Sequence, residues 1–142
     1  MNRIKLIFLL VFSVVVWHVE ARAKQENDLQ RVIKTCIKAS DADEEFVKLT
    51  FDGKFQPSLE FKEYLFCFAR EAGMVNLDNS MNNDVIEKMT AKILKDKRAA
   101  KEIRDDCDNT LYDPLNTVYY TFKCFITKIK EMSSAKKRRR RS

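Results

Sequence analysis

The chain has 142 residues, with 27 Lys and Arg against 21 Asp and Glu, four Cys, two Gly and two Pro. Its only His (His18) and its only Trp (Trp17) lie close to the N-terminus. The rest of the chain therefore lacks the imidazole on which Ser-His-Asp triads and many zinc sites depend, and we expect no enzyme, no cofactor and no metal site.

Residues 1–23 have the pattern of a secretory signal peptide. A short basic segment precedes an apolar run over residues 6–17, and Ala21–Ala23 fits a small-x-small cleavage site, with Val19–Ala21 as the alternative. The apolar run is too short to span a membrane. We therefore expect a secreted, extracellular protein that begins near Lys24 and has no transmembrane segment.

The basic charge is concentrated at the two ends of the chain. Three of the Lys and Arg lie in the predicted signal peptide and six are consecutive over residues 136–141, which leaves 18 basic and 20 acidic residues between 24 and 135. This mildly acidic body lacks the basic aromatic surface of nucleic-acid-binding domains. The acidic clusters at 43–45 and 105–108 lack the ligand spacing of an EF-hand and are interpreted as solvated helix ends.

Helical periodicity and capping signals predict six helices after the signal peptide. The first covers Glu26–Ala39. The second opens at Asp41, which has a Glu three residues on as in a capping box, and a turn at 51–54 follows it. The third runs from an N-cap at Ser58 to a C-terminal Gly73 and is apolar nearly all round, so we expect it to be deeply buried.

Three more helices follow a predicted loop at 74–81. Asn82 or Asn83 caps the fourth, and a break near Asp96 separates it from the fifth. The sixth begins with Asp113 as N-cap and ends near Met132. Its apolar residues recur at steps of three and four: Leu115, Val118, Tyr119, Phe122, Phe125, Ile126 and Ile129. So broad a stripe predicts the central helix of a bundle.

The last ten residues, 133–142, are predicted to be a basic disordered tail. The run Lys136 to Arg141 is suited to heparan sulfate, anionic lipid or another polyanion. A processing site and a solvated tail without an assigned task are the alternatives.

All four cysteines fall on predicted helices, at Cys36, Cys67, Cys107 and Cys124. An even number of Cys in a small secreted domain indicates two disulfides, which here would fasten helix to helix. Four cysteines allow three pairings, and their spacing does not choose among them.

The cysteine spacing, the stretch CFAREAG from Cys67 and the stretch TFKCF around Cys124 resemble insect odorant-binding proteins of the pheromone-binding and general-odorant-binding type. That family has six Cys on six helices, paired first–third, second–fifth and fourth–sixth. With Cys67 as the third and Cys124 as the sixth, Glu63 and Leu115 occupy the second and fifth positions. The resemblance is thus to the four-cysteine, or "minus-C", type, and it implies the disulfides Cys36–Cys67 and Cys107–Cys124.

The resemblance implies a compact all-α, six-helix domain over residues 24–132, with two disulfides and an internal apolar cavity. Its implied function is that of a carrier of small hydrophobic ligands such as odorants, pheromones or other lipophiles, as a monomer or weak dimer, with an odorant receptor as a further partner. The alternative is a secreted cationic effector that binds polyanions or membranes through its tail. No nucleic-acid partner is expected.

The candidate cavity walls are apolar residues of the predicted helices, each of which would serve equally well as core filling. They are Tyr64, Phe68, Ile86, Met89, Ile103, Tyr119, Phe122 and Ile126. A tyrosine hydroxyl, from Tyr64, Tyr119 or Tyr120, would orient a polar ligand group. Glu63 is the candidate acid for control of ligand release at low pH if it is buried in the cavity, and an ordinary exposed glutamate is the alternative.

Overall fold

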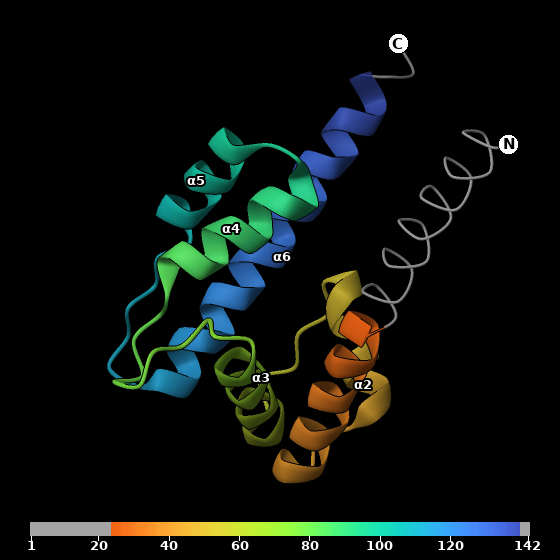
Figure 1. Cartoon of the computed structure of the whole chain (residues 1–142), viewed down its shortest axis with the longest axis vertical. Coiled ribbons are helices and arrows are strands. Elements are labelled where there is room, and N and C mark those ends of the chain that lie inside the picture. Colours follow the sequence, from red (N-terminus) through yellow and green to blue (C-terminus); the bar gives the residue numbers. More distant parts are fainter. Residues whose placement is uncertain (1–23, 140–142) are drawn as a thin grey trace, which may run out of the picture. The chain divides into compact units, whose positions relative to one another are not determined.

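The computed structural model describes residues 24–139, so the signal-peptide prediction for residues 1–23 lies outside the described residues. The chain divides into two compact units, Met1–Thr35 and Cys36–Ser142. In the first unit, residues 24–35 are helical, and an exposed ion pair joins Arg31 to Asp28 at 3.2 Å. Helical residues 36–40 begin the second unit, which contains all the elements labelled in Figure 1.

The second unit continues with α2 (Glu44–Leu49), the 3₁₀ turn η1 (Thr50–Asp52), α3 (Leu59–Glu71), α4 (Asn83–Leu94), α5 (Lys97–Asp106) and α6 (Pro114–Arg139). Together with the helix over residues 24–40, these make six α-helices in the described part of the chain. The only β contact found there is an isolated bridge between Val75 and Met81. The all-α prediction is confirmed.

Short polar side chains begin the helices, as predicted for Ser58 and Asp113 and, of the two candidates Asn82 and Asn83, at Asn82. At the predicted break, Asp96 is the N-cap of α5. The prediction that Asp41 caps the second helix is wrong. Asp43 is the cap, and its Oδ1 accepts a hydrogen bond from the Phe46 N–H at 3.1 Å. Asp41 instead has φ +58°, a left-handed conformation outside the extended range that an N-cap residue adopts.

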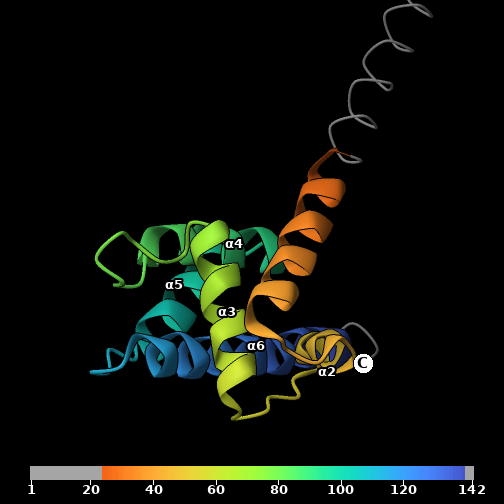
Figure 2. The same ribbon diagram turned by 90° about the horizontal axis from the view of Figure 1, so that it is seen from below.

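The central position predicted for α6 is confirmed, because α6 packs against α3, α4 and α5. Figure 1 shows α4 passing across α6, and the turned view in Figure 2 separates these two helices into different layers with α3 running across α6. Two disulfides fasten this arrangement. Cys36–Cys67 joins the helical residues before α2 to α3, and Cys107–Cys124 joins the end of α5 to α6.

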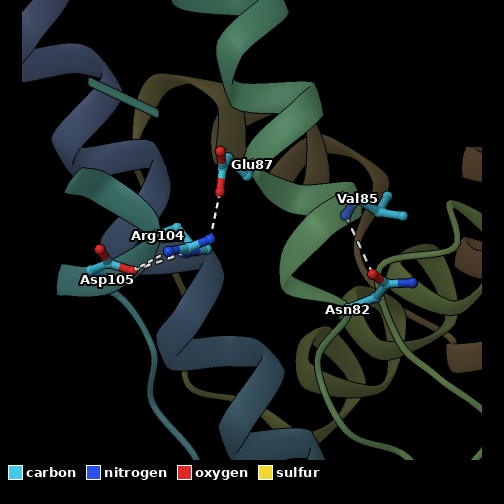
Figure 3. A network of polar contacts seen from close by, with 5 residues as sticks. All are labelled: Asn82, Val85, Glu87, Arg104 and Asp105. Atoms are coloured by element: carbon cyan, nitrogen blue, oxygen red, sulfur yellow. Dashed lines mark hydrogen bonds and ion pairs between the residues drawn. The ribbon is translucent and has the colours of Figure 1, made fainter. Parts of the chain in front are cut away.

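A polar network fastens α5 to α4 (Figure 3). The guanidinium of Arg104 donates to Glu87 on α4 at 2.5 Å and to Asp105 on its own helix at 2.6 Å. At the start of α4, Asn82 Oδ1 accepts a hydrogen bond from the Val85 N–H at 3.3 Å. The Arg104–Glu87 contact joins α4 to α5 across the hairpin, whose turn is made by Lys95 in the left-handed conformation.

Two features of the helices differ from the prediction. α6 continues to Arg139, so residues 133–139 are helical rather than a disordered tail, and no Gly or Pro interrupts them. Basic side chains in a last helical turn also interact favourably with the helix dipole. In α3, Phe61 and Leu65 are buried, but Leu59 is 58% exposed. This helix therefore buries one broad face and not its whole circumference.

Candidate functional site: an apolar hollow between α4 and α6

An apolar hollow with a volume of about 90 Å³ lies between α4 and α6. α4 supplies Ile86, Met89, Thr90 and Ile93; α6 supplies Thr121, Phe122, Phe125, Ile126 and Ile129; and Met74 follows α3. Met89 and Ile93 are 37% and 63% exposed, so the hollow reaches the surface beside them. None of these wall residues is ionisable.

The spacing of side chains along the two helices explains why the hollow forms here. On α4, Ile86, Thr90 and Ile93 follow one another at steps of four and three, which places them on one face of the helix. On α6, Phe122, Ile126 and Ile129 do the same. Because α4 and α6 are in contact, the two stripes bound one apolar space from opposite sides.

Two wall residues, Thr90 and Thr121, carry hydroxyls, and both are buried. Thr121 is only 2% exposed, and its hydroxyl has no hydrogen-bond partner within the described residues. Leaving a buried hydroxyl unpaired costs roughly 1–3 kcal/mol. The Thr121 oxygen is closed off by the surrounding packing, so the surface of the hollow itself is almost entirely hydrocarbon.

The hollow is smaller than the roughly 300–1,000 Å³ of typical ligand pockets. Its walls include two methionines, Met74 and Met89, whose unbranched side chains adjust readily to fill or open space. Met89 also lies at the surface opening. Movement of this side chain would enlarge the hollow without displacing a helix.

The structure brings half of the predicted wall residues together. Ile86, Met89, Phe122 and Ile126 line the hollow. The other four predicted residues, Tyr64, Phe68, Ile103 and Tyr119, are not among its walls. Ile103 is 2% exposed on α5 and belongs to the packed core.

Tyr64, Phe68 and Tyr119 belong to an aromatic cluster that continues to the hollow. Tyr64 and Phe68 have ring centroids 6.2 Å apart, and Phe68 contacts the wall residue Phe122 edge-on at 6.3 Å. Phe61 stacks on Tyr64 at 6.1 Å. Burial raises the pKa of Tyr64 to about 12, because the phenolate would lose its hydration. Tyr120 is 48% exposed and lies outside the hollow.

Sequence reasoning missed six of the wall residues: Met74, Thr90, Ile93, Thr121, Phe125 and Ile129. Of these, Phe125 and Ile129 belong to the apolar stripe predicted for the sixth helix but were not predicted as walls. A signal for Thr121 existed, because Thr117, Thr121 and Phe125 are spaced by four on α6 and all three are buried. Threonine methyl groups pack as apolar surface, so counting them would have widened the stripe.

The comparisons with known proteins agree with this arrangement. The sequence pattern of the PBP/GOBP family matches residues 18–128, more than three quarters of the chain. The chain belongs to the PBP/GOBP family. This membership supports a role as a carrier of small ligands. No curated protein sequence matches the chain closely enough to be counted as a relative.

Two solved structures of odorant-binding proteins share this PBP/GOBP fold. The odorant-binding protein dmelOBP28a from Drosophila melanogaster has a TM-score of 0.65 at 13% identity, over 78% of this chain and 96% of that one. The fatty acid binding protein OBP56a from the oral disk of the blowfly Phormia regina has a TM-score of 0.61 at 21% identity, over 76% of this chain and 94% of that one. At these identities the likeness concerns the fold alone.

Glu63 on α3 and Leu115 on α6, which stand at the second and fifth cysteine positions of the family pattern, border the same surface hollow in this chain. This second hollow has a volume of about 550 Å³ and also borders Cys67. Glu63 is exposed and is not a wall of the apolar hollow. Of the two alternatives for Glu63, an acid buried in the cavity and an ordinary exposed glutamate, the structure has the second, because its face of α3 points to the surface.

Proposed function

We propose that this protein is a secreted, non-enzymatic carrier that binds small hydrophobic ligands in the hollow between α4 and α6. The observation that carries the proposal is a set of ten wall residues without one ionisable group, placed inside the fold of the PBP/GOBP family. None of the described helices is long and apolar enough to cross a membrane.

The driving force for binding is the removal of apolar ligand surface from water, at about 25 cal/mol per Å². The phenylalanine and isoleucine walls provide that contact. Entry would occur beside Met89 and Ile93, the two exposed wall residues, and Met89 would move to admit the ligand. The process needs only reversible burial and involves no covalent step.

A fluorescence experiment tests this function with a variant that fills the hollow. N-Phenyl-1-naphthylamine is titrated into residues 24–142 and then displaced by a panel of volatile and fatty compounds. Met89→Trp should weaken probe binding by at least about tenfold, because the indole occupies the opening. Leu77→Trp, at a position that is 98% exposed and not a wall, is the matched control and should bind as wild type. Equal binding by both variants, or none by wild type, would contradict the proposal.

Secretion has its own test. Expression of the full chain in insect cells should release a protein whose N-terminal sequence begins near Lys24. Retention of an uncleaved N-terminus inside the cells would contradict this part of the proposal.

A second candidate function rests on the basic end of α6. Its last turns carry Lys136, Lys137, Arg138 and Arg139. Lys136 and Lys137 line a broad surface hollow of about 650 Å³ together with Lys95. We propose that this end of α6 binds a polyanionic surface, to which it is attracted by charge.

Truncation separates the two functions. Removal of residues 135–142 should abolish retention on heparin and leave probe affinity unchanged, since no wall of the apolar hollow is removed. Loss of probe binding on truncation would count against the α4–α6 hollow as the ligand site. Unchanged heparin retention would count against the polyanion function.

A further inference from the structure

We propose that one end of the molecule docks on the surface of an anionic lipid bilayer, with Ile93 in the lipid interface and the opening of the apolar hollow facing the membrane. We call this end the basic pole; it consists of residues 92–98, around the turn between α4 and α5, and residues 132–139, at the end of α6. This inference rests on the proposed polyanion function and names the partner. The observations that carry it are the charge of the basic pole, its exposed apolar residues and the position of Ile93 between two hollows.

The two segments of the basic pole meet around one surface hollow, the hollow of about 650 Å³ described above. Residues 93–96 of the first segment and Met132, Ala135, Lys136 and Lys137 of the second are among its walls. In Figure 1 the last turns of α6 extend past the α4–α5 turn. The basic pole is therefore one continuous surface and not two separate basic segments.

Charge is distributed unevenly between the basic pole and the rest of the described chain. The basic pole has eight Lys and Arg and one acid, Asp96, whereas residues 24–91 and 99–131 have 14 basic and 19 acidic residues. Asp96 is engaged at the start of α5, where its Oδ1 accepts hydrogen bonds from two backbone N–H groups. Within residues 24–139, no ion pair joins the three lysines that line the hollow to an acid. An anionic surface therefore attracts the basic pole and repels the remainder, which fixes the orientation of docking.

Apolar side chains among these charges favour a bilayer over a sulfated polysaccharide as the partner. Ile93 is 63% exposed, Ala135 is exposed and Met132 is half-buried. A polysaccharide has no hydrocarbon with which to cover these side chains, whereas the boundary between lipid headgroups and acyl chains buries apolar residues and places basic ones against phosphate. Lysine ammonium groups reach the headgroups while their methylene stems lie along apolar surface. The basic pole therefore matches both layers of an anionic membrane surface.

Ile93 connects the basic pole to the ligand hollow. It is a wall of the apolar hollow between α4 and α6 and also a wall of the surface hollow in the basic pole. Met89, the other exposed wall of the apolar hollow, lies four residues earlier on the same face of α4. The opening of the apolar hollow therefore lies beside the basic pole, and docking through Ile93 places it against lipid. A hydrophobic ligand would then pass between bilayer and hollow without crossing water.

Vesicle cosedimentation tests docking and its dependence on charge. The secreted form of the full chain is mixed with vesicles of phosphatidylcholine alone or of equal parts phosphatidylcholine and phosphatidylserine. Wild type should bind only the anionic vesicles, and less at high salt. Lys136→Gln with Lys137→Gln should weaken this binding about 25-fold, since each basic residue near such a surface contributes about fivefold. Lys54→Gln with Lys123→Gln, which removes two exposed lysines outside the basic pole, is the matched control and should remain within about twofold of wild type, because salt screens distant charges.

Tryptophan fluorescence tests whether position 93 enters the lipid. Residues 24–142 contain no Trp, so Ile93→Trp provides a single reporter. On the anionic vesicles its emission should move to shorter wavelength and be quenched by brominated acyl chains, because an indole settles at the membrane interface. Leu77→Trp, at a position that is 98% exposed and outside the basic pole, is the control and should show neither change.

Heparin chromatography of the same proteins separates this inference from the polyanion function. If heparin retains wild type and anionic vesicles do not bind it, or if vesicles bind it while the indole of Ile93→Trp stays in water, the bilayer is overturned as the partner and the polyanion function stands. Equal losses for the two double lysine variants would overturn the basic pole as the docking surface. If neither heparin nor phosphatidylserine vesicles bind wild type, both proposals fail.

Discussion

Single side chains decide where the helices begin, and Asp96 shows how. It follows Lys95, whose left-handed conformation ends α4, and its Oδ1 accepts from the Arg98 and Ala99 N–H groups at 3.0 and 3.1 Å. One carboxylate therefore satisfies two of the amides that a helix start leaves unpaired. Without these hydrogen bonds, the first turn of α5 would fray and the α4–α5 hairpin would be less stable.

Asp96→Ala should lower the free energy of unfolding by about 1 kcal/mol, within the 0.5–2 kcal/mol range of N-cap losses. Urea denaturation at neutral pH measures the change. Asp108→Ala, at an exposed acid outside any helix, is the control and should remain within about 0.5 kcal/mol of wild type. Equal effects of the two substitutions would show that Asp96 acts through its charge and not through its hydrogen bonds.

Tyr64 provides a second prediction at the residue scale, on alkaline stability. Its pKa is raised by burial from the ordinary value of 10.0 to about 12, so between these values the native protein holds a proton that the unfolded chain releases. The stabilisation is complete below pH 10 and is lost as pH rises through 12. The unfolding free energy of wild type should therefore fall between pH 10 and 12, and less so in Tyr64→Phe.

The same substitution should remove a late-ionising component from the tyrosinate absorbance at 295 nm. Tyr120→Phe, at a half-exposed position, should leave that component in place. A wild-type titration complete by pH 10.5 would contradict burial of the Tyr64 hydroxyl.

At the scale of elements, α3 and α6 are held together without the disulfide that most family members carry at this place. Lys62 on α3 donates to Asn116 Oδ1 on α6 at 2.8 Å, and its ammonium lies 5.4 Å from the Tyr119 ring centroid. Both contacts occur beside Glu63 and Leu115. Polar and cation–π contacts thus join the two helices where a covalent bond is missing.

The double variant Glu63→Cys with Leu115→Cys should form a third disulfide, because these positions are next in sequence to Lys62 and Asn116, whose side chains are in contact at 2.8 Å. Closing this loop should raise the free energy of unfolding by up to about 4 kcal/mol on the chain-entropy estimate. A free-thiol assay and urea denaturation measure the two effects. The single variants, each with one free thiol, are the controls, and two titratable thiols in the double variant would contradict the proximity of these positions.

At the scale of the whole molecule, two features determine how ligand affinity depends on pH. Residues 24–142 contain no His, and the walls of the hollow carry no ionisable group. No unperturbed side chain titrates between pH 6.0 and 7.5 in this part of the chain. The affinity for a neutral probe should therefore change by less than about twofold across that range. Placing a His at the opening, as Met89→His, should introduce a dependence on pH, with weaker binding at pH 6.0. A steep fall in wild type above pH 6 would contradict the assignment of the ligand to this hollow.

Much of this fold follows from the local sequence, because caps and helical periods act over a few residues. Ser58, Asn82, Asp96 and Asp113 mark helix starts, and the apolar stripe of α6 identifies the central helix. Composition alone shows that residues 24–142 contain no His. Each of these properties depends on neighbours in the chain, so it can be recognised without knowing how the helices pack.

The site itself was decided by tertiary structure. Whether an apolar residue fills the core or faces a hollow depends on the residue opposite it, and that residue lies far away in sequence. Tyr64 and Ile86 look alike as helical apolar residues, yet one joins an aromatic cluster and the other lines the hollow. Thr121 shows the same dependence. Only the packing of α6 against its neighbouring helices buries this threonine among the walls of the hollow, and those neighbours lie far from it in sequence.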